Sequence, residues 1–340
     1  MRVFVLGGTG FISSHVVNCL VKDDHEIMVF HRGLTDHPLP VDVKRVTGDR
    51  RNLPDFSDTI ASFKPDIVLD MCAYFEREAM ITIDALKDIP ERYVMISSQD
   101  VYRGFGVILG VEQGGLEPVP IYEDAPVRKS YYIHRNEKRK PADDQWYYYE
   151  KILVERILTE NLDCPVTILR LPAVYGPGDP QHRLYSYVKR MADRRPAVIV
   201  QSKQAHWRWT RSYIENAAYA ITLAVSNERA AGQVYNVGEE EALSETEWVN
   251  VIGKSMSWNG EIVYVPEERL PGHTLNEMNW NQDFIVDSSK IRHDLGYTEL
   301  VSRTEALRKT VAWEIDHPPD SPDLRQVDYS EEDAILAELA

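Results

Sequence analysis

Residues 2–13 read Arg-Val-Phe-Val-Leu-Gly-Gly-Thr-Gly-Phe-Ile-Ser, an apolar run followed directly by a glycine-rich turn. The apolar run predicts a buried strand, and apolar residues at helical spacing over residues 11–21 predict a helix after the turn. Glycines let the backbone approach a pyrophosphate, and a helix N-terminus offers it N–H donors and partial positive charge. The turn therefore predicts a dinucleotide site with contacts from Gly7, Gly10, Phe11 and Ile12. Ser13 stands where the usual pattern has its third glycine.

The alternation of short apolar strands and helices continues through the first half of the chain. Further strands are expected at residues 26–30, 43–47, 66–70, 92–96 and 166–170, and helices at 76–87 and 146–159. Such alternation is typical of a parallel sheet with helices on both faces. The predicted fold class is α/β, a Rossmann-type doubly wound parallel sheet with a smaller, interleaved C-terminal substrate lobe.

The second half is less regular. Residues 211–226 suggest a helix and residues 233–237 a strand, with proline-rich stretches around them. We therefore assign residues 1–175 to the dinucleotide-binding domain, with returns near 209–240 and 283–295. The remainder, 176–340, forms mainly the substrate-binding lobe and C-terminal helices, and the acidic tail after residue 320 is expected to be a solvated terminal helix.

Composition narrows the class of protein. The net charge of -16 argues against a general nucleic-acid binder, which needs a basic face to neutralise phosphates. The three cysteines are an odd number without metal-ligand spacing, so neither a disulfide framework nor a metal site is expected. No charged-then-apolar leader is evident, and no apolar stretch approaches the roughly 20 residues of a membrane span. We expect a soluble cytoplasmic protein.

The ends of the second and third strands bear on the cofactor. His31 and Arg32 follow the second strand, where an acidic residue would bind ribose hydroxyls and a basic one can accept a 2′-phosphate. They favour NADP, with NAD as the alternative; the other interpretation of Arg32 is a solvated loop residue. Asp49 ends the third strand, where its carboxylate can accept the adenine amino group or cap the next helix.

Tyr147 and Lys151 lie four residues apart in the run Trp-Tyr-Tyr-Tyr-Glu-Lys at 146–151. On a helix they share one face, and the ammonium lowers the pKa of the phenol toward working pH. Such a phenol can exchange protons with a substrate hydroxyl or carbonyl. The spacing alone does not decide, because the chain has 18 tyrosines and a second match at Tyr185 and Lys189.

Several motifs appear in a fixed order along the chain. The glycine turn is followed by Ser-Ser-Gln-Asp-Val-Tyr at 97–102, then by the Tyr147/Lys151 pair, then by Leu-Arg-Leu-Pro-Ala-Val-Tyr-Gly-Pro-Gly at 169–178. Together they resemble the extended short-chain dehydrogenase/reductases, and more narrowly the NAD(P)-dependent epimerase/dehydratase family, over about residues 1–240. Residues 66–74 and 123–126 look like a bacterial branch whose substrates are poorly defined.

The resemblance implies roles for individual residues. Tyr147 transfers the proton, Ser98 hydrogen-bonds the reacting oxygen, and Lys151 binds the nicotinamide ribose and lowers the pKa of Tyr147. It also favours Tyr147/Lys151 over Tyr185/Lys189, which follows the wrong strand and suggests an amphipathic helix of the lobe. Further cofactor contacts implied in this way are Arg50, Cys72, Ala73, Tyr74, Ser97, Tyr147, Lys151, Pro172 and Val174.

Departures from the family pattern bear on the substrate. Asp100 can act as a catalytic base, but Gln99 stands where dehydratases have a carboxylic acid. Ala173 replaces the asparagine that holds a substrate diphosphate, whereas Arg211 matches the arginine that contacts substrate phosphate; a structural ion pair is its other interpretation. We expect Tyr74, Gln99, Ala173 and Arg211 to contact a small-molecule substrate. Arg211 favours an anionic group on it, whereas Ala173 argues against a standard nucleotide sugar.

The connection over residues 103–144 is long for a compact domain, and such connections are often lids or binding loops. It contains Tyr-Tyr-Ile-His-Arg at 131–135 and Lys-Arg-Lys at 138–140. We hypothesise that it covers the substrate; a charged surface loop is the alternative. Trp207 and Trp209, just before Arg211, either line the substrate site or fill the core.

The sequence thus predicts an NAD(P)-dependent epimerase, dehydratase or ketoreductase. It would act on a hydroxyl or carbonyl carbon of a sugar or sugar-like small molecule, by hydride transfer with Tyr147 as acid/base. The alternative is a catalytically silent, cofactor-binding regulatory or RNA-associated protein on the same fold, against which the intact Ser98, Tyr147 and Lys151 set and the acidic charge argue. The resemblance further implies a homodimer paired through residues 76–87 and 146–159.

Overall fold

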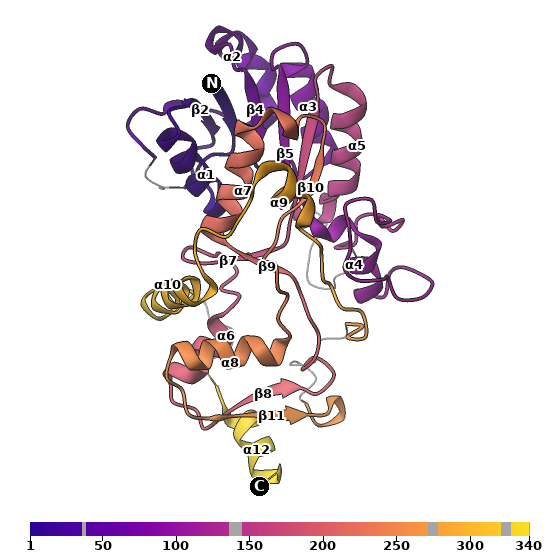
Figure 1. Cartoon of the computed structure of the whole chain (residues 1–340), viewed down its shortest axis with the longest axis vertical. Helices are drawn as coiled ribbons and strands as arrows, with labels where there is room; N and C mark the ends of the chain where they lie inside the picture. Colours follow the sequence, from indigo (N-terminus) through magenta and orange to yellow (C-terminus); the bar gives the residue numbers. More distant parts are fainter. Residues whose placement is uncertain (36–38, 136–144, 271–277, 321–327, 340) are drawn as a thin grey trace.

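The computed structural model describes residues 1–35, 39–135, 145–270, 278–320 and 328–339. Its centre is a seven-stranded sheet in which every neighbouring pair is parallel, in the order β10-β6-β5-β4-β1-β2-β3 (Figure 1). The strands are β1 (Arg2–Leu6), β2 (Glu26–His31), β3 (Lys44–Thr47), β4 (Ile67–Asp70), β5 (Arg92–Ser98), β6 (Val166–Leu171) and β10 (Val234–Asn236). The predicted α/β doubly wound parallel sheet is confirmed.

Both faces of this sheet are buried. Along β1, Val3 and Val5 join one apolar cluster while Phe4 and Leu6 join another, as expected where successive side chains alternate. The first cluster includes α1 (Phe11–Lys22) and α7 (Ile214–Ser226); the second includes α2 (Ser57–Phe63), α3 (Glu76–Leu86) and α5 (Lys151–Asn161). Burial on both faces explains why the strands read as continuous apolar runs.

A smaller lobe lies beyond the carboxyl ends of the strands (Figure 1). It contains a two-stranded parallel sheet with helices beside it, and a short parallel pair, β7 with β9, leads toward it from β6. Its elements are β7 (Ala173–Tyr175), α6 (Tyr185–Ala192), β8 (Ala197–Gln201), β9 (Arg211–Tyr213), α8 (Glu245–Ser255), β11 (Glu261–Val265), α10 (Arg303–Asp316) and α12 (Ser330–Leu339). The remaining short helices are η1 (Arg50–Phe56), η2 (Gln99–Val101), α4 (Arg103–Ile108), η3 (Gln145–Tyr148), η4 (Glu228–Ala230), η5 (Glu267–Arg269) and α9 (Ser289–Leu295).

Two predicted helices differ from the observed ones. Residues 211–213 form β9 and only the rest of the expected helix is α7. The helix expected over residues 146–159 begins at Lys151, because Glu150 is its N-cap and accepts the N–H of Ile152. The residues before it form η3, which is a 3-10 turn.

The acidic tail forms the expected terminal helix, but part of it is bound to the lobe. In α12, Glu332 pairs with Arg190 and Asp333 pairs with Arg195. The ring of Tyr329, just before the helix, lies against the guanidinium of Arg195 at 4.5 Å. Within the residues described, no helix is both long enough and apolar enough to cross a membrane.

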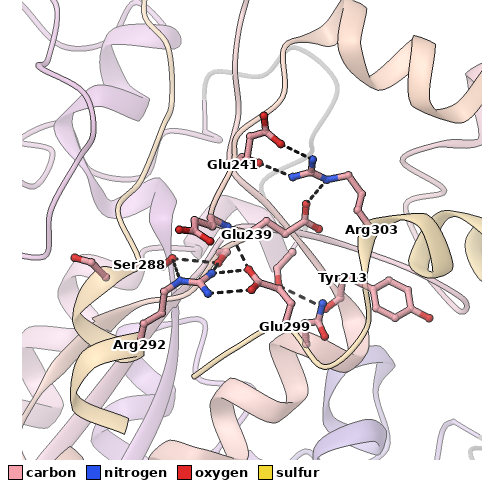
Figure 2. A network of polar contacts seen from close by, with 12 residues as sticks. Tyr213, Glu239, Glu241, Ser288, Arg292, Glu299 and Arg303 are labelled. Carbon is pink, nitrogen blue, oxygen red and sulfur yellow. Dashed lines mark hydrogen bonds and ion pairs between the residues drawn. The ribbon is translucent and has the colours of Figure 1, made fainter. Parts of the chain in front are cut away.

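A polar network joins the end of β10 to the C-terminal helices (Figure 2). Arg303 of α10 pairs with Glu239 at 3.0 Å and with Glu241 at 2.9 Å. Arg292 of α9 holds Glu299 with two nitrogens, and its Nε contacts Ser288 Oγ at 3.2 Å. These pairs fix the C-terminal segment against the sheet edge that faces the lobe.

A buried ion pair lies beside the glycine turn. Arg50 and Asp70 are 7% and 0% exposed, and their Nη1 and Oδ1 atoms are 2.7 Å apart. Thr82 accepts a further hydrogen bond from Arg50, and the Tyr93 hydroxyl donates to Asp70. The pair therefore joins η1, β4, α3 and β5 in one polar cluster inside an apolar environment.

We expect Arg50→Met to lower the free energy of unfolding by about 3–5 kcal/mol, because it leaves the buried Asp70 carboxylate without its counter-charge. Urea denaturation followed by circular dichroism measures this. The matched control is Arg51→Met, which breaks the solvent-exposed pair with Asp49 and should change stability little. Equal effects of the two substitutions would contradict the structural role of Arg50.

Candidate active site

The glycine turn between β1 and α1 admits only glycine at its first two positions. Gly7 has a φ of +84°, and a Cβ there would lie 2.7 Å from Cys72 Sγ. A Cβ on Gly8 would lie 2.6 Å from Val29 Cγ1. The turn stands where the strand order reverses, with β2 on one side of β1 and β4 on the other. Ligands of open α/β sheets bind at this position.

The N-terminus of α1 is open to an anion. Gly10, its N-cap, is exposed, and its first turn carries no acidic residue. Ser13, at the place of the third glycine, accepts the Gly10 N–H at 2.8 Å. Phe11 and Ile12 are half-buried at the first two helical positions. A close backbone turn followed by a free helix N-terminus fits the pyrophosphate of a dinucleotide.

The residues after β2 and β3 take different roles from one another. Arg32 is exposed and lies near enough to Asp49 to help lower its pKa. Asp49 caps η1 through the Arg51 N–H, and hydrogen bonds from Arg51 bring its pKa to about 2. Helix capping is therefore the observed role of Asp49, and Arg50 is committed to Asp70 in the core. Arg51 is exposed but paired with Asp49, and Arg32 is exposed as well.

The segment after β4 connects the glycine turn to Lys151. Cys72 Sγ contacts the Leu6 carbonyl at 3.6 Å, next to Gly7. The Ala73 carbonyl accepts the Lys151 ammonium at 2.6 Å, and the Tyr74 ring lies 4.6 Å from the same nitrogen. Cys72, Ala73 and Tyr74 thus form a strip between the two predicted parts of the cofactor site.

The two serines at the end of β5 point in different directions. The Ser97 hydroxyl donates to the buried Glu155, which also pairs with Arg170 at 2.7 Å. The Ser98 hydroxyl accepts the Asp100 N–H at 3.2 Å and so caps η2. Strand alternation therefore commits the Ser97 side chain to the interior and leaves Ser98 beside Asp100.

Tyr147 does not share a helix face with Lys151, so this part of the sequence prediction is wrong. It lies in η3, where its ring packs against Tyr148 and lies 4.8 Å from the guanidinium of Arg135. Its carbonyl accepts Arg135 Nε at 3.0 Å. The connection over residues 103–144, which we expected to cover the substrate, therefore contacts Tyr147 through Arg135. Residues 138–140 lie outside the described part of the chain.

Tyr149 is the tyrosine that reaches the Ser98–Asp100 turn. Its hydroxyl donates to Asp100 Oδ2 at 2.7 Å. Burial and then the Asp100 carboxylate raise its pKa well above the ordinary value, while a hydrogen bond with Ser98 acts in the opposite direction. Asp100 Oδ1 is buried and has no hydrogen-bond partner among the described residues. The cluster thus combines a protonated phenol, a serine and a carboxylate with one oxygen still available.

Lys151 is buried at the first position of α5. Its ammonium donates to the carbonyls of Ala73 and Ile96 at 2.6 and 2.8 Å. Burial lowers its pKa to about 8, while the carboxylates of Asp70 and Asp100 raise it. The amine is therefore mostly cationic at neutral pH and loses its charge as the pH rises through about 8.

A fully buried ion pair fixes this arrangement. Arg128 and Glu150 have side chains 0% exposed and 3.2 Å apart. Arg128 also donates to the Asp100 carbonyl, and Glu150 accepts the N–H groups of Tyr132 and Ile152. Sequence reasoning missed Tyr149 and this pair. The available signal was an acidic residue directly before a helix, which is typical of an N-cap.

Two of the predicted substrate contacts, Ala173 and Arg211, lie opposite each other on the short strand pair that leads from the sheet toward the lobe. Ser98 pairs with Leu171 across the sheet, and Ala173, two residues on, pairs with Arg211 of β9. Gln99 is buried, and its amide nitrogen donates to the Val237 carbonyl at 2.8 Å.

Three further predicted contacts occupy more interior positions. Pro172 is half-buried between β6 and β7, and Val174 belongs to the core. Trp207 fills the core, donating to the Gln282 carbonyl at 2.7 Å. On the lobe, α6 buries Tyr185 and pairs Lys189 with Asp193, which confirms that the second Tyr/Lys match lies on an amphipathic helix.

Comparison with known proteins places the chain in a family. The model of the NAD dependent epimerase/dehydratase family matches residues 3–103 and 120–238, and the chain belongs to this family. A 2′-dehydrokanamycin reductase of Streptomyces kanamyceticus is 24% identical over 79% of this chain and 70% of the relative. A dTDP-glucose 4,6-dehydratase of Salmonella typhimurium is 22% identical over 92% of each chain.

Solved structures show the same fold. A UDP-glucuronic acid 4-epimerase from Bacillus cereus, in complex with UDP-glucuronic acid and NAD, superposes with a TM-score of 0.66. It is 19% identical, and the match covers 93% of this chain and 99% of that one.

We expect the amine of Lys151 to titrate near pH 8 in the isolated protein, well below the value of about 10.4 for exposed lysines. Asp100→Asn should lower this pKa further, because it removes a carboxylate that favours the ammonium. NMR of the full chain with 13C-labelled lysine side chains measures both, with Lys151→Met giving the assignment. Asp49→Asn is the control and should leave the titration unchanged. Titration near 10.4 would contradict the buried site.

Proposed function

We propose that the chain is a nicotinamide-dependent enzyme that interconverts a hydroxyl and a carbonyl carbon of a small molecule. The observation that carries this is the convergence of Ser98, Asp100, Tyr149 and Lys151 beside the glycine turn. Family membership and the names of the relatives support a reaction of the epimerase, dehydratase or reductase type.

The residues present fit a dinucleotide. The backbone of Gly7 and Gly10 and the N-terminus of α1 would hold the pyrophosphate. The strip of Cys72, Ala73 and Tyr74 leads from there to Lys151, whose ammonium would hold the nicotinamide ribose. When bound, the nicotinamide supplies the hydride acceptor or donor. The protein contributes binding, alignment and control of the proton.

A tyrosine hydroxyl at the Ser98–Asp100 turn is proposed to move that proton. Tyr147 is the candidate from the motif and Tyr149 the one favoured by the observed contacts. A phenol hydrogen-bonded to Asp100 keeps its own proton at neutral pH, so it is suited to donate to a developing alkoxide. Ser98 would then orient the reacting oxygen, and Lys151 would stabilise negative charge as it develops.

The reaction class follows from the acids and bases available. Asp100 has a buried oxygen free to accept a proton, whereas Gln99 beside it has no proton to deliver as an acid. Water elimination needs both functions, so an epimerase or a reductase is the better-supported member of the class. The homodimer and the RNA-associated alternative stay predictions, testable by sedimentation and by RNA retention at physiological salt.

Comparing Tyr149→Phe with Tyr147→Phe distinguishes which of the two tyrosines transfers the proton. NAD and NADP turnover is first screened at 340 nm, with product analysis for epimers, against sugars, nucleotide sugars, aminoglycosides and steroids. With the best substrate, we expect kcat/KM to fall about 100-fold or more in Tyr149→Phe and far less in Tyr147→Phe. The reverse ranking would return the role to Tyr147 and would require α5 to extend by a turn. Wild-type rates in both variants would sink the mechanism.

The choice of dinucleotide depends on Arg32. Its exposed cation favours NADP, whereas the similar solved structure carries NAD. If the cation holds a 2′-phosphate, Arg32→Ala weakens NADP binding about tenfold or more and leaves NAD binding unchanged. Calorimetric titration of both dinucleotides measures this, with Arg51→Ala as the neighbouring control. Tighter NAD binding that is indifferent to Arg32 would overturn the NADP prediction.

A further inference from the structure

Arg211 lies between the catalytic edge of the sheet and the lobe. It begins β9, which pairs with β7 so that Arg211 stands opposite Ala173. Ala173 follows Leu171, the partner of Ser98 in the main sheet, by two residues. Arg211 is therefore linked through β7 to the strand end that carries Ser98.

The guanidinium of Arg211 is only partly satisfied. The residue is 8% exposed, and its guanidinium carbon lies 4.5 Å from the ring centre of Trp248. Its Nη2 donates to Glu245 at 3.2 Å. Its Nε and Nη1 are buried, and neither has a hydrogen-bond partner in the part of the chain that the structure describes. Buried donors of this kind call for an acceptor oxygen from a ligand or from water.

The carboxylate of Glu245 is held in place beside these donors. Glu245 is 5% exposed at the start of α8 and also accepts the hydroxyl of Tyr187 from α6. Burial and then this carboxylate raise the pKa of Tyr187 well above its ordinary value, so the phenol remains a donor. Glu245 is thus fixed from two sides with Arg211 as its counter-ion.

A second arginine near Tyr187, Arg190, is also neutralised by a carboxylate of the chain. Arg190 lies near enough to Tyr187 to affect its pKa. It pairs with Glu332 from the terminal helix, and the two side chains are 13% and 17% exposed. Arg211 and Arg190 therefore each have a carboxylate of the chain itself as a partner. The net charge of -16 adds no attraction for an anion.

We propose that Glu245 is a specificity-determining residue that selects an uncharged acceptor over a diphosphate ester at Arg211. This rests on the proposed function, which makes the space beside Arg211 part of the substrate site. A hydroxyl or carbonyl oxygen satisfies the two free N–H donors without adding charge. A pyrophosphate on the same guanidinium would place its negative charges against a buried carboxylate that cannot move away. The substrate class is a polyhydroxylated or carbonyl compound without a nucleoside diphosphate.

Glu245→Gln tests this, because the amide keeps the size and can still accept from Tyr187 while the charge is lost. Calorimetric titration of the full chain uses inorganic pyrophosphate and UDP-glucose as probes. The wild type is expected to bind both weakly, and Glu245→Gln at least about tenfold more tightly. Adding Arg211→Gln to that variant should abolish the gain. The matched control is Glu247→Gln, which removes one charge on the same helix and should gain nothing.

If Glu245→Gln does not fold, comparing the wild type with Arg211→Gln also provides a test. The proposal requires that the wild type and Arg211→Gln bind pyrophosphate equally weakly. Tight wild-type binding of either probe that is lost in Arg211→Gln would overturn it. Dinucleotide binding, measured separately, distinguishes the outcomes. Its absence would remove the proposed function, whereas dinucleotide binding together with Arg211-dependent pyrophosphate binding would remove only the role of Glu245.

Discussion

The proposed catalytic site depends on one buried ion pair, Arg128 with Glu150. Neither side chain contacts solvent, so each charge is tolerated only because the other is present. Glu150 caps α5 and fixes Lys151 as its first residue, while Arg128 holds the carbonyl of Asp100. The pair therefore sets the distance between the lysine and the serine–carboxylate turn. It also determines which of three consecutive tyrosines meets that turn.

The parts of the fold that follow from local pattern were predictable. The apolar runs and the glycine turn identify the parallel sheet, because burial on both faces and a positive φ at Gly7 leave direct traces in residue type. The choice of Ser98 over Ser97 also agrees with strand alternation. The start of α5 had one local signal, Glu150 as an acidic N-cap, but Arg128, which holds Glu150 in place, stands 22 residues away along the chain.

The roles of charged residues near the site were also not predictable from the sequence. Asp49 and Arg50 follow a strand at the position where cofactor contacts are expected, yet one caps a short helix and the other completes a core ion pair. Carboxylates and guanidinium groups serve caps, ion pairs and ligands equally well, so residue type alone does not assign the role. Arg32, by contrast, is exposed, and its charge helps to lower the pKa of Asp49.

The two halves of the site have separate tasks. The proposed proton and hydride chemistry belongs to the carboxyl edge of the sheet, where Asp100, Tyr149 and Lys151 are fixed by buried partners. The proposed selection belongs to the lobe, where Arg211 and Glu245 come from β9 and α8 and pair with each other. Within the described residues their side chains make no ion pair or hydrogen bond to the first group. A change of charge at residue 245 can therefore alter what is accepted without altering how the proton moves.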